Sequence, residues 1–283
     1  MSYQVTRKAI LIGCPGRGGN FLHGVEKDLI SVRSFLSSDK GGRWFDEEII
    51  TLKNPTFSQV RFQIKSAIAD YVFIYFSGHG WTRNLNQRML SFNDKSEQDL
   101  TLLNDSPRQL VIIDACRNHV APGIHGIPDF GEQWDSFDGY YESRELFDKH
   151  IINSPAGKII VHATQNGQFS FDNPMKGGYF TQALLTSATK NTDVNTYTIA
   201  SIKEVLGSVP NILKQQNNSQ IPSLYKSGSL TVPFAIRIPQ QNLVRYTKTN
   251  RKKLEVSNDI SSGGVATLFG LGLLLIAILS SEK

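Results

Sequence analysis

Two uninterrupted apolar runs, Tyr71–Phe76 and Leu110–Ile113, constrain the fold of this 283-residue chain more than any other feature. Neither run alternates with polar residues, which is typical of strands buried on both faces of a parallel sheet. The first run leads to His79 within Ser-Gly-His-Gly, and the second leads to Cys116 within Asp-Ala-Cys-Arg. In open α/β sheets, ligand-binding and catalytic residues lie at the carboxyl ends of the strands, so we expect the two side chains to face one another. A thiol nucleophile and its base need that arrangement.

Each of these two residues alone also has an ordinary structural explanation. A single buried cysteine is commonly a small apolar residue, and a single histidine is commonly a hydrogen-bonded structural residue. Their joint occurrence at two predicted strand ends, with glycines on both sides of His79, favours a catalytic pair.

Predicted strands and helices alternate along most of the chain. The periodicity predicts strands at 8–13, 48–52, 71–76, 88–92, 110–113, 158–163 and 232–238. It predicts helices at 25–37, 57–69, 140–152 and about 199–215, and a further helix that begins within the stretch 177–185. This order indicates an α/β domain with a mostly parallel sheet and helices on both faces.

The two motifs resemble those of the caspase–metacaspase cysteine peptidases (clan CD, peptidase family C14), and the resemblance extends roughly over residues 8–236. Caspases proper have Gln before Ala-Cys and Gly two residues after the Cys, where this chain has Asp114 and Asn118. His79 also lies closer to the Cys than in caspases. The stretch GGYFTQALL at 177–185 is similar to bacterial caspase-like peptidases. These features place the resemblance with the metacaspase and bacterial caspase-like branch.

The resemblance implies a caspase-like three-layer αβα sandwich over residues 1–238, with a six-stranded sheet whose last strand is Val232–Ile238. It implies that Cys116 attacks a peptide carbonyl as a thiolate while His79 handles the proton. The backbone N–H groups of Gly80 and Cys116 would hold the oxyanion. No cofactor takes part in this chemistry.

The resemblance also implies specificity, because metacaspases cleave after Arg or Lys through an acidic pocket. Three positions match that pocket: Asp114, Ser77 and Asp28. Asp28 corresponds to the last residue of the family's Gly-x-x-Asn-Asp motif, which is Gly24–Asp28 here, with Lys27 in place of the Asn. Two converging carboxylates select a cationic side chain. Each also has an ordinary structural explanation, Asp28 as a first-turn acid of a helix and Asp114 as a loop cap at a strand end.

Two further residues bear on specificity. Asp172, in the loop after the predicted 158–163 strand, borders the expected pocket and is a weaker candidate for it. Arg17 supports the rival hypothesis of cleavage after an acidic residue. In caspases, loop arginines bind the acidic side chain of the residue that precedes the cleaved peptide bond.

The segment 117–156 is long and rich in Gly, Pro, Asp and aromatic residues, and connections of this length are commonly functional. Caspases are cut in this region on activation, so Arg144 and Lys149 are candidates for self-cleavage. The alternative is that both are ordinary solvated residues on a helix.

Some metacaspases are activated by calcium. The same segment contains four acidic residues, without EF-hand spacing, that could bind it: Asp129, Glu132, Asp135 and Asp138. No metal is expected at the catalytic centre, because the other histidines are scattered without ligand spacing: His23, His119, His125, His150 and His162.

Composition narrows the functional classes. The net charge of +5 is modest and no basic stripe with interleaved aromatics is present in the first 240 residues, which argues against nucleic-acid binding. A disulfide between Cys14 and Cys116 would consume the proposed nucleophile, so a reducing compartment is expected. The amino terminus does not resemble a signal peptide.

The end of the chain has a different composition. Residues 239–262 form a polar, basic linker, and 263–279 are uncharged and apolar on every side, as expected of a short transmembrane helix. Basic residues before this segment predict a single-pass tail anchor with the peptidase domain in the cytoplasm. The alternatives are a buried core helix and a tail that assembles into an oligomer or a pore.

Two functional hypotheses result. The first is a membrane-anchored endopeptidase that cleaves a protein substrate after Arg or Lys, with an upstream activator or regulatory partner as a further candidate partner. The resemblance to bacterial relatives implies a role in regulated cell death or antiphage defence. The second is a membrane-disrupting or scaffolding effector whose apolar tail acts while the peptidase fold regulates it. The oligomeric state stays open, because caspases pair through their sixth strands and metacaspases are usually monomers.

Overall fold

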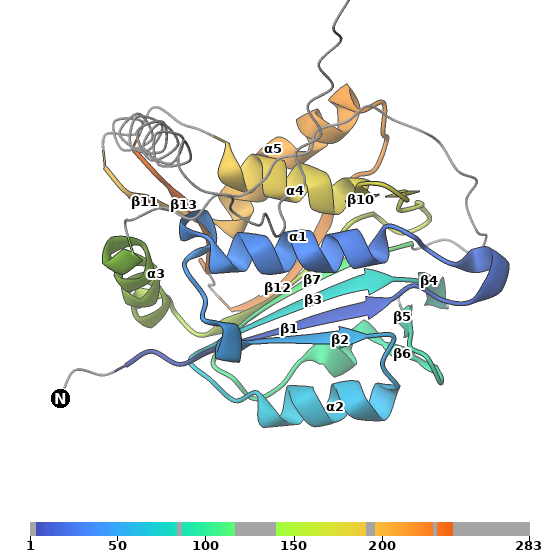
Figure 1. Cartoon of the computed structure of the whole chain (residues 1–283), viewed down its shortest axis with the longest axis horizontal. Coiled ribbons are helices and arrows are strands. Elements are labelled where there is room, and N and C mark those ends of the chain that lie inside the picture. The colour runs from blue at the N-terminus through green and yellow to red at the C-terminus, as the bar shows by residue number, and fades with distance from the viewer. Residues whose placement is uncertain (1–3, 84–86, 117–139, 191–195, 229–230, 240–283) are drawn as a thin grey trace, which may run out of the picture. The chain divides into compact units, whose positions relative to one another are not determined.

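The computed structural model describes residues 4–83, 87–116, 140–190, 196–228 and 231–239, with backbone alone at 140–142. These residues belong to one compact unit, 1–240. Its centre is a six-stranded sheet with the order β12-β8-β7-β3-β1-β2 (Figure 1). The five parallel strands are β1 Arg7–Cys14, β2 Ile49–Lys53, β3 Tyr71–Gly78, β7 Arg108–Ala115 and β8 Gly157–His162. The sheet therefore has the predicted, mostly parallel character.

Helices cover both faces of this sheet, which gives the three predicted layers. Alternate residues of β3 enter different cores: Phe73 and Tyr75 pack on one face, and Val72 and Ile74 on the other. Four helices contribute to the first core, namely α1 Val25–Ser37, α3 Tyr140–Asn153, α4 Tyr179–Thr189 and α5 Ile202–Gln215. Helix α2, Phe57–Ser66, covers the second (Figure 1). All eight residues of β3 are buried, as its unbroken apolar run predicts.

Smaller elements surround the sheet. An antiparallel three-stranded sheet follows His79 directly, and a short two-stranded hairpin follows β8. One further pair of strands, β11 and β13, and four short 3-10 helices complete the described elements. Their bounds are β4 Gly80–Arg83, β5 Gln87–Ser91, β6 Ser96–Gln98, β9 Asp172–Asn173, β10 Gly177–Gly178, β11 Thr198–Ser201, β13 Pro233–Arg237, η1 Gly18–Asn20, η2 Asp39–Gly41, η3 Asp46–Glu48 and η4 Asp99–Leu102.

The prediction that Val232–Ile238 forms the sixth strand of the sheet is wrong. This segment contains β13, which pairs with β11 in a separate two-stranded sheet. The sixth strand is β12, Ser223–Gly228, which runs antiparallel to β8 at the edge. Sequence periodicity missed β12 because five of its six residues are exposed, so it carries no apolar pattern. Its position follows from backbone pairing with β8.

Helix α3 is attached to the sheet by a buried ionic cluster. Arg7 of β1 lies 3.2 Å from Asp148, and Arg144 donates to both carboxylate oxygens of Glu48 at 2.7 and 3.0 Å. The Arg7 side chain is fully buried and also donates to the Gly42 carbonyl oxygen. Burial lowers the pKa of Arg7 to about 10, so it stays charged at neutral pH.

The predicted membrane segment 263–279 and the linker 239–262 lie, apart from residue 239, outside the described residues. Within the described part of the chain, no helix combines the length and apolar character needed to span a bilayer.

Candidate active site

Strands β1, β3 and β7 end together, and this places the two reactive residues side by side. Gly78, the last residue of β3, pairs with Cys14 of β1 on one side and with Ala115 of β7 on the other. A Cβ atom on Gly78 would lie 2.4 Å from the Cys14 carbonyl oxygen. The first glycine of the Ser-Gly-His-Gly motif is therefore required by close strand packing. His79 and Cys116 each follow directly at the carboxyl end of the sheet.

The His79 imidazole is oriented by a backbone carbonyl group. Its Nε2 lies 2.6 Å from the oxygen of Asn20, in the loop between β1 and α1. A carbonyl can only accept, so Nε2 carries the hydrogen and Nδ1 is left as the acceptor for a thiol proton. Gly16 of the same loop has a φ of +82°, and a Cβ there would lie 2.7 Å from Nε2. Sequence reasoning missed Asn20 because its contribution comes from the main chain.

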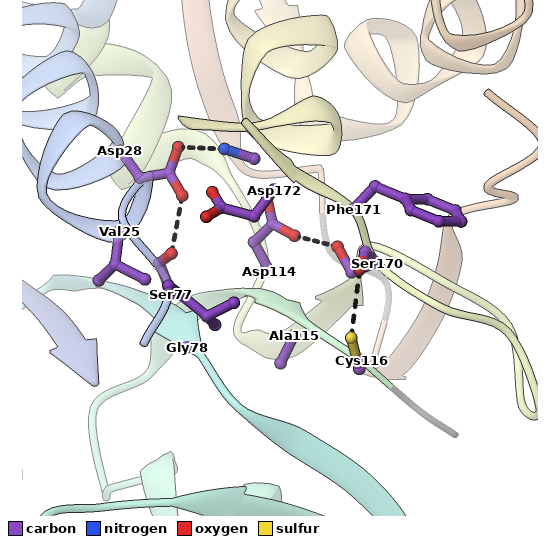
Figure 2. A pocket seen from close by; sticks show the side chains of 12 residues that line it. Val25, Asp28, Ser77, Gly78, Asp114, Ala115, Cys116, Ser170, Phe171 and Asp172 are labelled. Atoms are coloured by element: carbon purple, nitrogen blue, oxygen red, sulfur yellow. Dashed lines mark hydrogen bonds between the residues drawn. The ribbon is translucent and has the colours of Figure 1, made fainter. Parts of the chain in front are cut away.

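The Cys116 thiol has a different partner in this structure. Its Sγ donates to the Ser170 carbonyl oxygen at 3.2 Å (Figure 2), and no hydrogen bond joins it to His79, both residues being described. Burial raises the pKa of the thiol, and the carboxyl groups of Asp114 and Asp172 raise it further. The resting thiol is therefore protonated at neutral pH, and its reaction requires it to turn from Ser170 towards His79.

An acidic pocket adjoins the thiol. Cys116, Asp28, Asp114 and Asp172 line one pocket together with Ser77 (Figure 2). The carboxyl groups come from α1, β7 and the β9 hairpin, three elements far apart in the chain. Among the described residues, no lysine or arginine forms an ion pair with any of them.

Hydrogen bonds hold the two buried carboxyl groups in place. Asp28 accepts from the Ser77 hydroxyl at 2.7 Å and from the Gly178 N–H at 2.8 Å. Asp114 accepts from the Ser170 hydroxyl at 2.5 Å and from the Thr181 N–H and hydroxyl at 3.1 and 2.7 Å. Burial raises the pKa of both groups, that of Asp28 well above its ordinary value, and the Asp114 charge raises it further.

Residues 6–234 match the family model of the caspase domain. The chain belongs to the caspase-domain family. It is a cysteine-type peptidase, and the matched region includes both His79 and Cys116. The fold is also similar to that of caspase-1 from Spodoptera frugiperda, with a TM-score of 0.53 and 16% identity, over 82% of this chain and 90% of that one. No curated protein matches the sequence.

Three further predicted site residues, Asp172, Arg17 and Gly80, lie at different positions relative to the pocket. Asp172 lies at the pocket and accepts from the Gly24 N–H at 2.9 Å, where α1 begins. Burial raises the pKa of this carboxyl as well. Arg17 does not line the pocket, and its guanidinium donates to the Asn93 side-chain oxygen. Gly80 packs tightly under the nucleophile, since a Cβ there would lie 3.0 Å from the Cys116 carbonyl oxygen.

The self-cleavage candidates Arg144 and Lys149 both lie within α3. Arg144 is held by Glu48, whereas Lys149 is exposed. Because peptidases bind extended backbone, cleavage at either residue requires α3 to unwind locally. The four acids considered for calcium lie outside the described residues, and the described part of the chain holds no cluster of three or more metal-binding side chains.

The structure explains the two glycines of the GGYFTQALL stretch. A Cβ on Gly177 would lie 2.2 Å from the Asp28 carboxylate, and one on Gly178 would lie 2.2 Å from the Asp114 carboxylate. We expect Gly178→Ala to displace both carboxyl groups and to lower kcat/KM at least about tenfold, as misplacement of a binding group does. Steady-state kinetics measures this. Gly207→Ala is the control, because a Cβ there meets no atom within 4 Å, and equal activity of the two variants would contradict the prediction.

Proposed function

We propose that this caspase-domain protein is an endopeptidase that cleaves after Arg or Lys. One observation supports this most strongly: three carboxyl groups line the pocket beside the nucleophile, and none of them forms an ion pair with a lysine or arginine of the described residues. Burying an ionised carboxylate without a counter-charge has an unfavourable free energy. This is why burial raises the pKa of Asp28, Asp114 and Asp172. A guanidinium or ammonium group from the substrate would supply the missing charge.

The chemistry follows from the positions of the groups. With the side chain of the residue before the scissile bond (P1) in the acidic pocket, its carbonyl carbon comes next to Cys116. The thiol passes its proton to Nδ1 of His79, which the Asn20 carbonyl orients. The thiolate attacks, and the oxyanion is proposed to bind the N–H groups of Gly80 and Cys116. His79 then protonates the leaving amine, and water hydrolyses the acyl-enzyme.

We also propose that the chain is anchored in a membrane by 263–279, with the peptidase on the cytoplasmic side. The support is the uncharged, apolar composition of that segment and the basic residues before it. Proteolysis at a membrane suits a role in regulated cell death or antiphage defence. Protease accessibility in sealed vesicles tests the orientation.

Cleavage of short fluorogenic peptides tests the specificity. Full-length protein in a non-ionic detergent is given peptides that differ only at P1: Arg, Lys, citrulline, Asp or Ala. We expect kcat/KM to be at least about 100-fold higher for Arg than for citrulline, which has the same shape without the charge. Asp114→Asn should remove most of this difference. Cleavage after Asp alone would contradict the acidic pocket and support the rival role of Arg17.

A further inference from the structure

We infer that Asp172 is a positioning residue of the acidic pocket: it caps the start of α1 and thereby fixes Asp28 for the P1 cation, which it does not itself bind. This inference rests on the proposed function, because it concerns how the same pocket recognises Arg or Lys. It gives Asp172 a different role from Asp28 and Asp114, although all three line the pocket.

The carboxyl group of Asp172 lies against the N-cap residue of α1, which is Gly24. Its Oδ2 accepts from the Gly24 N–H at 2.9 Å, and a Cβ atom on Gly24 would lie 1.8 Å from Oδ1. In a capping box the acceptor for this N–H comes from the third helical residue. That residue is Lys27, whose side chain can only donate. Asp172 therefore supplies the missing acceptor from the β9 hairpin.

A second hydrogen bond joins the same two elements in the opposite direction. Asp28, four residues after Gly24, accepts from the Gly178 N–H at 2.8 Å. Within the helix, the Asp28 N–H donates to the Gly24 carbonyl oxygen at 3.0 Å, and within the hairpin Asp172 and Gly178 are paired. The first turn of α1 and the hairpin are thus joined twice, through residues that are also linked within each element. Displacing Asp172 from Gly24 therefore moves Asp28 relative to the pocket.

This joint explains the glycine that opens the Gly24–Asp28 motif. Besides the Asp172 carboxyl group, a Cβ atom at position 24 would lie 2.8 Å from the Asn173 carbonyl oxygen. A larger side chain would therefore push the hairpin away from α1. The motif thus contributes twice to the pocket, because Asp28 faces the cation and Gly24 makes room for the residue that holds the helix.

The two possible roles of Asp172 require different chemistry. A cap requires an oxygen acceptor at a fixed place, which an amide provides as well as a carboxylate. A direct partner of the P1 cation requires negative charge, which Asn lacks and Glu retains. Glu carries its carboxylate one methylene further from the main chain, and the close contact with Gly24 leaves no room for it there. Asp172→Asn and Asp172→Glu are therefore a matched pair, the first keeping the shape and the second the charge.

Cleavage of the Arg and citrulline peptides by full-length protein in a non-ionic detergent tests the two roles. We expect Asp172→Asn to keep kcat/KM for the Arg peptide within about threefold of the wild type, because the cap remains. We expect Asp172→Glu to lower it at least about tenfold, because Asp28 is misplaced. The citrulline peptide should lose less, since it has no charge for Asp28 to bind. A larger loss in Asp172→Asn than in Asp172→Glu overturns the inference.

Hydrogen–deuterium exchange at the Gly24 N–H measures the cap independently of cleavage. We expect slow exchange in the wild type and in Asp172→Asn, and exchange at least about tenfold faster in Asp172→Glu. Equal exchange in the wild type and Asp172→Glu overturns the inference.

Asp94→Ala is the control for loss of a helix cap as such. Asp94 accepts from the N–H of Phe57, the first residue of α2, at 2.7 Å, and it does not line the pocket. We expect this variant to cleave the Arg peptide like the wild type. If it loses as much activity as Asp172→Glu, general loss of helix stability explains both variants and the inference is overturned.

The outcomes separate the inference from the proposed function. Preference of the wild type for Arg over citrulline, with the larger loss in Asp172→Asn, overturns the inference and leaves the proposed function intact. Absence of any preference for Arg overturns the proposed function, and exchange at Gly24 then decides whether Asp172 caps α1. Thermal melting identifies a variant that fails to fold. If this is Asp172→Glu, Asp172→Ala replaces it, because it also removes the cap.

Discussion

Replacing Cys116 with Ala is expected to lower the kcat/KM of the full-length protein by about 10⁴-fold or more, because losing a nucleophile removes the covalent route entirely. Cleavage of the peptide with Arg at P1 measures the effect. His79→Gln should fall to a similarly low level, since effects of groups that act as a unit are not additive.

Cys14→Ala is the matched control for this prediction. Cys14 is the only other cysteine; its thiol is buried at the end of β1, and burial raises its pKa to about 12. Cys14 does not line the pocket, so we expect activity to remain while stability falls by about 1 kcal/mol. If Cys14→Ala lost activity while Cys116→Ala stayed active, the assignment of Cys116 as the nucleophile would be wrong.

Arg7→Ala is expected to destabilise the domain by about 3–5 kcal/mol, the cost of removing one partner from a buried ionic cluster. The Arg7 side chain is fully buried beside Asp148, Glu48 and the ring of Trp44. Its removal leaves the buried carboxyl group of Glu48 and the half-buried one of Asp148 with Arg144 as their remaining described cation. Urea unfolding followed by circular dichroism gives the change in free energy.

Arg33→Ala provides the comparison for Arg7. Arg33 pairs with Asp46 at 3.0 Å, and this pair is far more exposed than the Arg7 cluster, with side-chain exposures of 37% for Arg33 and 86% for Asp46. An exposed pair contributes less than about 1 kcal/mol, so this variant should unfold close to the wild type. Equal losses in the two variants would show that burial of the Arg7 cluster does not govern its contribution.

Local patterns predicted much of the fold. The unbroken runs at Tyr71–Phe76 and Leu110–Ile113 mark the two central strands, because burial on both faces leaves no place for polar residues. The amphipathic spacing over Val25–Ser37 coincides with α1. Helix α2 begins where expected, with Thr56 and Gln59 forming a capping box, but it ends at Ser66, three residues early. Helix ends carry weaker signals than helix faces.

The main error concerned the sheet edge. The apolar pattern of Val232–Ile238 predicts a strand of the central sheet, but the segment contains β13, which pairs with β11 in a separate two-stranded sheet and lies against α4 and α5. The true edge strand, β12, is largely exposed and has no alternation of apolar and polar residues. Its place depends on backbone hydrogen bonds to β8, and these leave no trace in side-chain periodicity.

The sequence by itself determined the chemistry-bearing residues: two motifs at strand ends placed His79 and Cys116, and the resemblance pointed to Asp28 and Asp114. The tertiary structure alone decided how these residues are held. Asn20 and Ser170 act through carbonyl oxygens, and the Gln220, Tyr75 and Thr181 side chains form hydrogen bonds to residues far away in the sequence. A main-chain carbonyl has the same chemistry in every residue, and long-range hydrogen bonds have no local spacing, so neither can be recognised before the chain is folded.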